Sequence, residues 1–125
     1  MKKVLACLLV LTMVLGSFSV AFAGSYSDVA DNASYAQAVE VLTSLGLVSG
    51  DGDGTYRPTD AVKRSEMAKL IVVALGYGDF AAAQKATKFS DVPASHWASG
   101  YISFASDLGI IEGVGAGKFN PDVTV

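Results

Sequence analysis

Three stretches of the chain carry apolar residues at the three- and four-residue spacing of an amphipathic helix. Their apolar positions are, in chain order, Tyr35, Val39, Leu42 and Leu45; Met67, Leu70, Ile71 and Ala74; and Trp97, Tyr101, Phe104, Ala105 and Leu108. Glycines follow the first two stretches, where they can end a helix in a left-handed cap: Gly46, Gly76 and Gly78. The pattern predicts an all-α fold, with these apolar positions on the inner faces of the helices.

The first 23 residues have the pattern of a secretory signal peptide. Met1-Lys2-Lys3 precedes an apolar run from Val4 to Leu15, and Ala21-Phe22-Ala23 provides a small-x-small cleavage pattern. The apolar run is shorter than the ~20 residues of a helix that crosses a bilayer. We therefore predict cleavage after Ala23, export, and no membrane association of the mature chain.

The chain repeats itself with a shift of 63 positions. Tyr26-Ser27-Asp28-Val29 returns as Phe89-Ser90-Asp91-Val92, and Leu45-Gly46-Leu47-Val48-Ser49-Gly50 returns as Leu108-Gly109-Ile110-Ile111-Glu112-Gly113. A fixed period of this length indicates a repeat architecture. We expect residues 24–78 to form one complete helix-loop-helix repeat, residues 79–88 to form a connector without chemistry, and residues 89–125 to form a second repeat truncated before its second helix. Its apolar stripe predicts that further chain covers it, so we interpret the sequence as a fragment of a longer protein.

The loop Gly50-Asp51-Gly52-Asp53-Gly54 has a composition that suits calcium, phosphate or a tight turn. Its aspartates and Asp60 fall at ligand positions of an EF-hand-like loop, but Ser49 takes the first position and the bidentate glutamate is missing. The second copy keeps the glycines and replaces the two aspartates by Val114 and Ala116. Because no Gly-Lys-Ser/Thr follows, a phosphate site is not indicated. We interpret the glycines as turn residues and predict no metal and no cofactor.

The net charge and the single cysteine and histidine of the chain argue against several functions. The net charge is −3 at pH 7, and loss of Lys2 and Lys3 with the signal peptide makes the chain more acidic, which argues against a nucleic-acid partner. The single cysteine, Cys7, lies in the signal peptide, so the mature chain forms no disulfide. His96 is the only histidine and has no recognisable catalytic partner. We predict no catalytic residues and no enzyme activity in this segment.

The order of these elements resembles a known module. An aromatic-Ser-Asp-Val opening, an aromatic-Ala helix start, a glycine-rich loop that ends in an aromatic and a proline, and Val62-Lys63-Arg64-Ser65-Glu66 before a helix are together similar to the S-layer homology (SLH) module. The resemblance covers Tyr26 to about Gly78 as one complete repeat and Phe89 to Val125 as about two thirds of another. It implies helix-loop-helix repeats, usually three around a pseudo-threefold axis, that anchor secreted proteins noncovalently to the bacterial cell wall.

The resemblance implies an acidic, in many relatives pyruvylated, secondary cell-wall polysaccharide or peptidoglycan-linked glycan as ligand, with Arg64 as its main contact. Arg64 lies in the first turn of a helix, where unpaired N–H groups favour an anion; the alternative is a salt bridge from Arg64 to Asp60 or Glu66. Lys63 stands where the family has a capping threonine. Either Asp60 or Thr59 caps the helix, or Lys63 adds a second positive charge at the ligand.

Five further residues complete the predicted glycan site. Asp28 and Asp91 match a family landmark, although single carboxylates before a helix favour bonds to local backbone N–H groups over bonds to ligand. Trp97 can stack on a sugar ring opposite Arg64 or pack in the core. Gly52 and Gly115 would let the loop backbone approach a sugar, although turn geometry alone also explains them.

We expect the mature protein at the cell surface, in the cell wall or S-layer, with further SLH repeats or surface-layer subunits as possible partners. Two alternative functions stay open. One is a calcium-binding or protein-interaction repeat that resembles a dockerin in its aspartate-rich loop. The other is the anchor segment of a larger surface enzyme or porin encoded beyond Val125.

Overall fold

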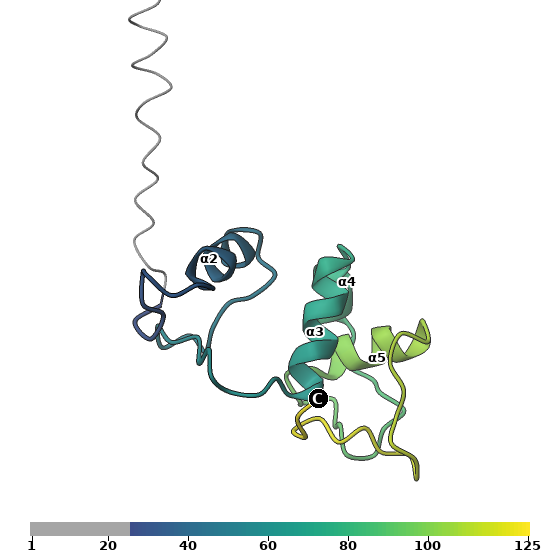
Figure 1. Cartoon of the computed structure of the whole chain (residues 1–125). Helices are drawn as coiled ribbons and strands as arrows, with labels where there is room; N and C mark the ends of the chain where they lie inside the picture. Colours follow the sequence, from purple (N-terminus) through teal and green to yellow (C-terminus); the bar gives the residue numbers. More distant parts are fainter. Residues whose placement is uncertain (1–25) are drawn as a thin grey trace, which may run out of the picture.

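The computed structural model describes residues 26–125 (Figure 1). The predicted signal peptide, residues 1–23, lies outside the described residues. Within residues 26–125 the chain forms four helices and no strand: α2 (Ala36–Ser44), α3 (Arg64–Ala74), α4 (Gly78–Ala83) and α5 (Ser99–Asp107). The predicted all-α class is confirmed. No helix in this range combines the length and the apolar character needed to cross a bilayer.

Glycines end the three longer helices. The predicted caps Gly46 and Gly76 are confirmed, whereas Gly78 begins α4. Gly46, Gly76 and Gly109 have φ values of 70°, 83° and 70°, the left-handed region that favours glycine. After α2, the N–H of Gly46 donates to the carbonyl of Thr43, and the N–H of Leu47 donates to that of Leu42. The same bonds recur after α3 and α5, so carbonyls at each helix end are satisfied locally.

Helix α3 packs with the second repeat and not with α2. Figure 1 shows α3, α4 and α5 together, with α2 to one side; α2 contacts none of the other described helices. In the main core cluster, Ala68 of α3 meets residues that all come from the second repeat: Phe89, Val92, Ala98, Ile102 and Phe119. A neighbouring cluster joins Val72 of α3 to Ala81 of α4 and Ala105 of α5. The first repeat therefore contributes its second helix to the core of the next one.

The predicted inner face of α3 is wrong. The buried residues of α3 are Ser65, Ala68 and Val72, whereas Ala74 is exposed and the other predicted positions, Met67, Leu70 and Ile71, are only half-buried. Small side chains of α3 face α5 because the two helices pack closely, and α5 contributes a small residue of its own, Ala105, to the cluster around Val72. Apolar spacing identified a helix but not its packed face.

The predicted connector contains a packed helix. Helix α4 buries Ala81 completely. At Gly100 of α5, a Cβ atom would collide with the carbonyl oxygen of Ala81 and would lie 2.5 Å from that of Gln84. Only glycine at this position permits such a close approach of α4, so residues 79–88 help to build the core.

The apolar stripe predicted for α5 is only partly internal. Trp97 and Leu108, at its two ends, are each 55% exposed, whereas Ala105 is fully buried. Phe104 is half-buried, and its ring packs against Tyr77 at 5.1 Å and Phe80 at 5.5 Å between centroids. The buried side of α5 is instead formed by Ile102, Ala105 and their small neighbours.

The first glycine of each loop lies under an aromatic ring. A Cβ at Gly113 would come within 2.6 Å of both the Phe89 ring and the carbonyl oxygen of Lys118, and Gly50 is crowded in the same way by Tyr26 and Thr55. Gly50 also has φ of 60°, but Gly113 has no positive φ. The repeated glycine is therefore a packing requirement in addition to a turn residue.

Gly113→Ala should lower the free energy of unfolding by about 1–3 kcal/mol, the usual cost of overpacking. The added methyl group has no space between the Phe89 ring and the Lys118 carbonyl. Urea unfolding followed by circular dichroism measures the change. The control is Gly109→Asn, because a Cβ there meets nothing within 4 Å and asparagine tolerates left-handed backbone. Equal stability of Gly113→Ala and the parent would contradict the packing requirement.

Candidate functional site

Asp28 and Asp91 each join the start of a repeat to its own loop. The Asp28 carboxylate accepts hydrogen bonds from the N–H groups of Tyr56 (2.8 Å) and Arg57 (2.7 Å). Asp91 accepts the corresponding bonds from Phe119 (2.9 Å) and Asn120 (2.8 Å). The prediction of backbone N–H partners is correct, but these partners are 28 and 29 residues downstream and not local. Any contact of these aspartates with glycan stays a prediction.

These hydrogen bonds lower the pKa of both carboxyl groups. Partial desolvation acts to raise the pKa of Asp91, but the N–H groups of Phe119 and Asn120 outweigh it and bring the pKa below the ordinary 3.8. The pKa of Asp28 is lowered in the same way by Tyr56 and Arg57, against desolvation. Both groups are therefore ionised in the folded chain at neutral pH.

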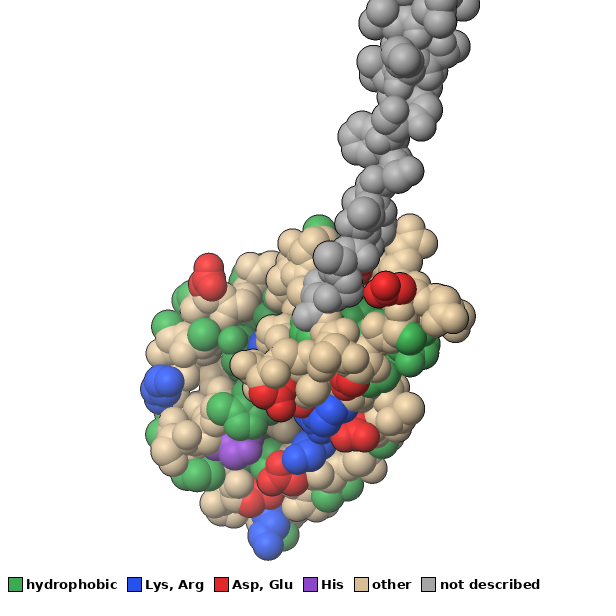
Figure 2. Space-filling model, turned by 90° about the vertical axis from the view of Figure 1, so that its left-hand side faces the viewer, with side chains coloured by type: hydrophobic (Ala, Val, Ile, Leu, Met, Phe, Trp, Pro, Cys, Tyr) green, Lys and Arg blue, Asp and Glu red, His purple; other side chains and the backbone are tan. Residues whose placement is uncertain are grey.

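The acidic residues of the first loop have partners within the chain. Arg57 forms ion pairs with Asp51, with Asp60 at 3.1 Å and with Glu66 at 3.5 Å. Its hydrogen bonds to Asp51 lower the pKa of that carboxyl. Asp53 accepts bonds from the N–H (2.9 Å) and hydroxyl (2.6 Å) of Thr55. Figure 2 shows acidic and basic side chains gathered side by side on one face.

Residues 26–125 contain no cluster of three side chains suited to hold a metal ion. Asp51 and Asp60 surround the Arg57 guanidinium, and Asp53 closes a turn with Thr55. These contacts explain why the aspartates occur in the first loop without requiring calcium.

The N-terminus of α3 is capped by the second repeat. The N–H of Arg64 donates to the carbonyl of Val123 (2.8 Å), and the N–H of Ser65 donates to that of Pro121 (3.0 Å). Glu66 accepts a bond from the N–H of Lys63 (2.8 Å), so it supplies one half of a capping box. No side chain accepts a hydrogen bond from the first N–H groups of α3, so the alternative in which Asp60 or Thr59 caps the helix is wrong. The N–H groups of Arg64 and Ser65 are occupied, contrary to the expectation of an open anion site.

The Arg64 side chain binds the loop of the second repeat. Its Nε donates to the carbonyl of Phe119 (2.9 Å) and its Nη2 donates to the carbonyl of Glu112 (2.7 Å). The guanidinium carbon lies 4.4 Å from the centre of the Phe119 ring, a cation–π contact. The predicted alternative of a salt bridge to Asp60 or Glu66 is wrong, because Arg57 holds those carboxylates. Among the described residues no carboxylate pairs with Arg64, so its charge is solvated only by neutral groups.

Lys63 also reaches the second repeat. Its Nζ lies 3.3 Å from the carboxylate of Asp122, in a pair whose side chains are 43% and 74% exposed. Exposed pairs of this kind contribute little stability. Backbone bonding at the same place joins Val62 to Val125 at 2.9 Å. Lys63 thus provides a second, weakly held positive charge near the loop that Arg64 binds.

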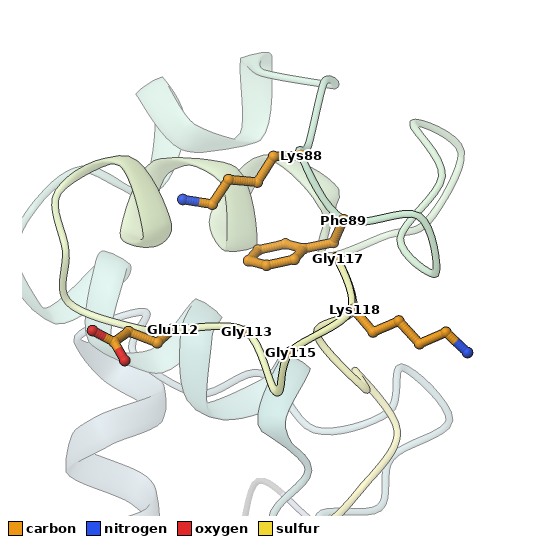
Figure 3. Close-up of a pocket in the computed structure, with 7 residues that line it drawn as sticks. All are labelled: Lys88, Phe89, Glu112, Gly113, Gly115, Gly117 and Lys118. Atoms are coloured by element: carbon orange, nitrogen blue, oxygen red, sulfur yellow. The ribbon is translucent and has the colours of Figure 1, made fainter.

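A hollow of about 410 Å³ lies on the same loop (Figure 3). Its lining comes from both ends of the second repeat: Lys88, Phe89, Glu112, Gly113, Gly115, Gly117 and Lys118. Lys88 lies over the Phe89 ring, with its Nζ 5.6 Å from the ring centre, and Lys118 extends away from it (Figure 3). Glu112 connects the hollow to Arg64, because its carbonyl accepts the Nη2 bond. Lys88 and Lys118 were not predicted as site residues from the sequence. Each directly precedes an aromatic residue that occurs in both repeats, and this position is the signal that could have identified them.

The structure gathers only part of the predicted site. Arg64, Lys63, Asp91 and Gly115 meet at the loop of the second repeat, whereas Asp28 and Gly52 belong to the first loop. Gly52 has φ of 83° and is exposed, which suits a turn. Trp97 is 55% exposed and stacks on His96 at 5.8 Å, so the core alternative for Trp97 is wrong. No described ring contact or hydrogen bond joins Trp97 to Arg64.

A family model described as the S-layer homology domain matches residues 25–68 and 88–125. The chain belongs to the S-layer homology family. The predicted resemblance is thereby confirmed. The match includes the aspartate and glycine positions of both repeats and the start of α3. An SLH domain is a binding or anchoring domain and not a catalytic one.

The similar proteins include two that are named for the cell surface or the S-layer and one that is named as an enzyme. The chain is 39% identical over 98% of its length to a cell surface protein of Thermoanaerobacter kivui, of which it covers 16%. It is 32% identical over 97% of its length to the S-layer protein EA1 of Bacillus anthracis, covering 14% of that protein. An exoglucanase of Acetivibrio thermocellus is 34% identical over 81% of this chain, which covers 10% of the enzyme. The SLH chain thus spans a small part of these relatives, and the names of the first two agree with the predicted cell-surface location.

We predict that the SLH chain loses stability in acid as Asp28 and Asp91 become protonated. Because folding lowers the pKa of both groups, their contribution is complete well above pH 3.8 and is lost as the pH falls through their folded-state pKa, below 3.8. The melting temperature should change little between pH 7 and 5 and then fall below about pH 4. Thermal melts across this range measure it.

Asp91→Asn should lower the melting temperature at pH 7 by roughly 5–10 °C and weaken the acid-induced fall, because asparagine cannot accept both N–H bonds with a full charge. Asp107→Asn, at an exposed aspartate of α5, is the matched control. An unchanged acid profile in Asp91→Asn would contradict the assigned role.

Arg64→Ala should lower the free energy of unfolding by about 1–3 kcal/mol, because it removes two hydrogen bonds and a cation–π contact between the repeats. Lys63→Ala is the control and should cost less than about 0.5 kcal/mol, since its ion pair is exposed. Urea unfolding of both variants measures the difference. Equal stability of the two variants would show that Arg64 does not hold the repeats together.

Proposed function

We propose that the chain anchors a secreted protein to the bacterial cell wall by binding an acidic secondary cell-wall polysaccharide. The observation that carries this proposal is the SLH match over both repeats. Relatives named as a cell surface protein, a middle cell wall protein and a surface layer protein support it. The chain covers 16% or less of each, so most of each of these relatives lies outside the matched region.

The chemistry of the second loop suits an anionic sugar. Arg64 has no carboxylate partner among the described residues, and Lys63 has only an exposed one. Lys88 and Lys118 add two further cations at the hollow. Gly115 and Gly117 leave the loop backbone open to close approach, because a Cβ atom at either position would meet nothing within 4 Å.

A carboxylate such as a pyruvate ketal would meet Arg64 at its outer edge. Nε and one hydrogen of Nη2 are held by the Phe119 and Glu112 carbonyls, so the Nη1 side of the guanidinium is the part left for ligand. A charge-assisted hydrogen bond there, with Lys63 nearby, would add to the attraction. In this proposal Arg64 has two roles, one in folding and one in recognition.

Alanine substitutions of Lys63, Lys88 and Lys118 test binding without disturbing the core. The chain, expressed for secretion and purified, is sedimented with cell-wall sacculi before and after chemical removal of their secondary polysaccharide. Binding should disappear after stripping. Each Lys→Ala change should weaken binding by about three- to tenfold at low salt, because each removes one long-range attraction to an anionic ligand.

The matched control is Lys85→Ala, an exposed lysine of the segment after α4 that does not line the hollow. Its binding should equal that of the parent chain. Failure of the folded chain to sediment with unstripped walls, or equal binding to stripped walls, would contradict the proposed ligand.

A further inference from the structure

The first loop contains two Asp-Gly pairs, and the second loop contains none. The pairs are Asp51-Gly52 and Asp53-Gly54, and the corresponding residues of the second loop are Val114-Gly115 and Ala116-Gly117. In an Asp-Gly pair the main chain can attack the side chain before it, because glycine has no side chain to block the approach. The first loop therefore has a chemical reactivity that the second loop lacks.

The reaction needs only water. The backbone nitrogen of the glycine bonds to the side-chain carboxyl carbon of the aspartate, and the carboxyl OH leaves with the proton of that nitrogen as water, which forms a succinimide ring. Water then opens the ring at either carbonyl. Cleavage between the nitrogen and the side-chain carbon restores aspartate, whereas cleavage between the nitrogen and the main-chain carbon gives isoaspartate. Nothing is oxidised or reduced, and the product has the mass of the parent.

The glycine nitrogens of both pairs are available for this attack. Within residues 26–125, no backbone carbonyl accepts the N–H of Gly52 or of Gly54. A Cβ atom at either glycine would meet nothing within 4 Å, so the space around the loop is open. Asp51 and Asp53 are both exposed. The nitrogens therefore do not decide which pair reacts.

The two aspartate carboxylates are held differently. Arg57 binds both oxygens of Asp51, with Nε on Oδ2 and with Nη2 on Oδ1 at 2.8 Å. The same guanidinium pairs with two further carboxylates, which help to fix its position. Asp53 is bound through Oδ1 alone, by the N–H (2.9 Å) and the hydroxyl (2.6 Å) of Thr55. Ring closure at Asp51 therefore requires release from Arg57 at each oxygen, whereas Asp53 has to leave only Thr55.

The same hydrogen bonds keep the carboxyl groups ionised. The neutral carboxyl is the form that loses water, so a lowered pKa slows ring closure. Hydrogen bonds from Arg57 lower the pKa of Asp51, and hydrogen bonds from Thr55 lower the pKa of Asp53. Arg57 and Thr55 therefore each protect an aspartate in two ways, by holding the carboxylate in place and by keeping it charged.

We propose that Asp53 is a site of spontaneous isomerisation to isoaspartate, and that Arg57 protects Asp51 from the same reaction. The isomerised main chain runs through the side chain of residue 53 and is longer by one carbon atom. This change displaces the carbonyl of Gly54, which accepts hydrogen bonds from the N–H (2.9 Å) and the hydroxyl (3.2 Å) of Ser27. Isomerisation thus loosens the first loop from the start of its own repeat.

The test follows isoaspartate in the purified chain, expressed for secretion, during incubation at neutral pH. Mass spectrometry with electron-transfer fragmentation distinguishes isoaspartate from aspartate at each position. A synthetic peptide of residues 50–58 gives the rates without the fold, and both of its aspartates should react at similar rates. In the folded chain the rate at Asp51 should be about tenfold lower than at Asp53, because the Arg57 hydrogen bonds must break first.

Arg57→Asn removes the protecting guanidinium and keeps the backbone. Arg57 and the corresponding Asn120 both have φ of 57°, a left-handed conformation that asparagine tolerates. The variant should raise the rate at Asp51 by about tenfold, to that of Asp53, and change the rate at Asp53 little.

Thr55→Val is the matched variant for the other aspartate. It removes the hydroxyl bond to Asp53 and keeps the backbone N–H bond. It should raise the rate at Asp53 by roughly threefold, and by more than the rate at Asp51.

Two results would overturn the proposal. The first is that no isoaspartate forms at Asp53 of the folded chain over a time in which the peptide is converted. The second is equal rates at Asp51 and Asp53 in the parent chain, or an equal rise at both in Arg57→Asn. That second result would mean that opening of the whole loop, and not release from Arg57, controls the reaction.

Discussion

The fold depends on the insertion of the α3 N-terminus into the loop of the following repeat. Arg64 and Ser65 donate backbone N–H groups to Val123 and Pro121, and the Arg64 side chain binds two further carbonyls. These bonds satisfy helix-end donors that would otherwise need water or a side-chain cap. They also satisfy loop carbonyls of the second repeat. The sequence repeat and the packing unit are consequently out of phase, because the packed unit combines the second helix of the first repeat with the first helix and loop of the second repeat.

This arrangement links folding to the proposed recognition of glycan. Arg64 brings a positive charge to the glycine-rich loop, and neutral carbonyls hold it there without cancelling the charge. A carboxylate partner would have neutralised it, as Asp51, Asp60 and Glu66 do for Arg57. The cation therefore faces the second loop only when the repeats interlock. A single isolated repeat would contain the same residues without this juxtaposition.

The sequence predicted local structure better than it predicted contacts between residues that are distant in the chain. Glycine caps such as Gly46 follow from short-range rules on left-handed backbone. That Asp91 binds backbone N–H groups was also predicted, but its partners lie 28 and 29 residues downstream, where short-range rules do not reach. The packed face of α3 did not follow, because periodicity finds a helix but cannot show that small residues such as Ala68 face a close neighbour. The partners of Arg64 were also missed, since they lie in another repeat. The sequence allowed Trp97 either to stack on a sugar ring or to pack in the core, and only its exposure in the structure decides against the core.

Residues that differ between the repeats determine how the packing surfaces of the two repeats differ. The repeated aspartate, glycine and aromatic rings hold each loop against the start of its own repeat, and this packing is the same in both repeats. The repeats differ at positions that contact other helices in the second one: Leu42 replaces Ala105, which packs with Val72 of α3, and Gln37 replaces Gly100, which admits α4. Arg57 is also specific to the first repeat, and it anchors that loop to Glu66 at the start of α3. A helix placed on the first repeat as α3 and α4 are placed on the second would therefore meet larger side chains at these two positions.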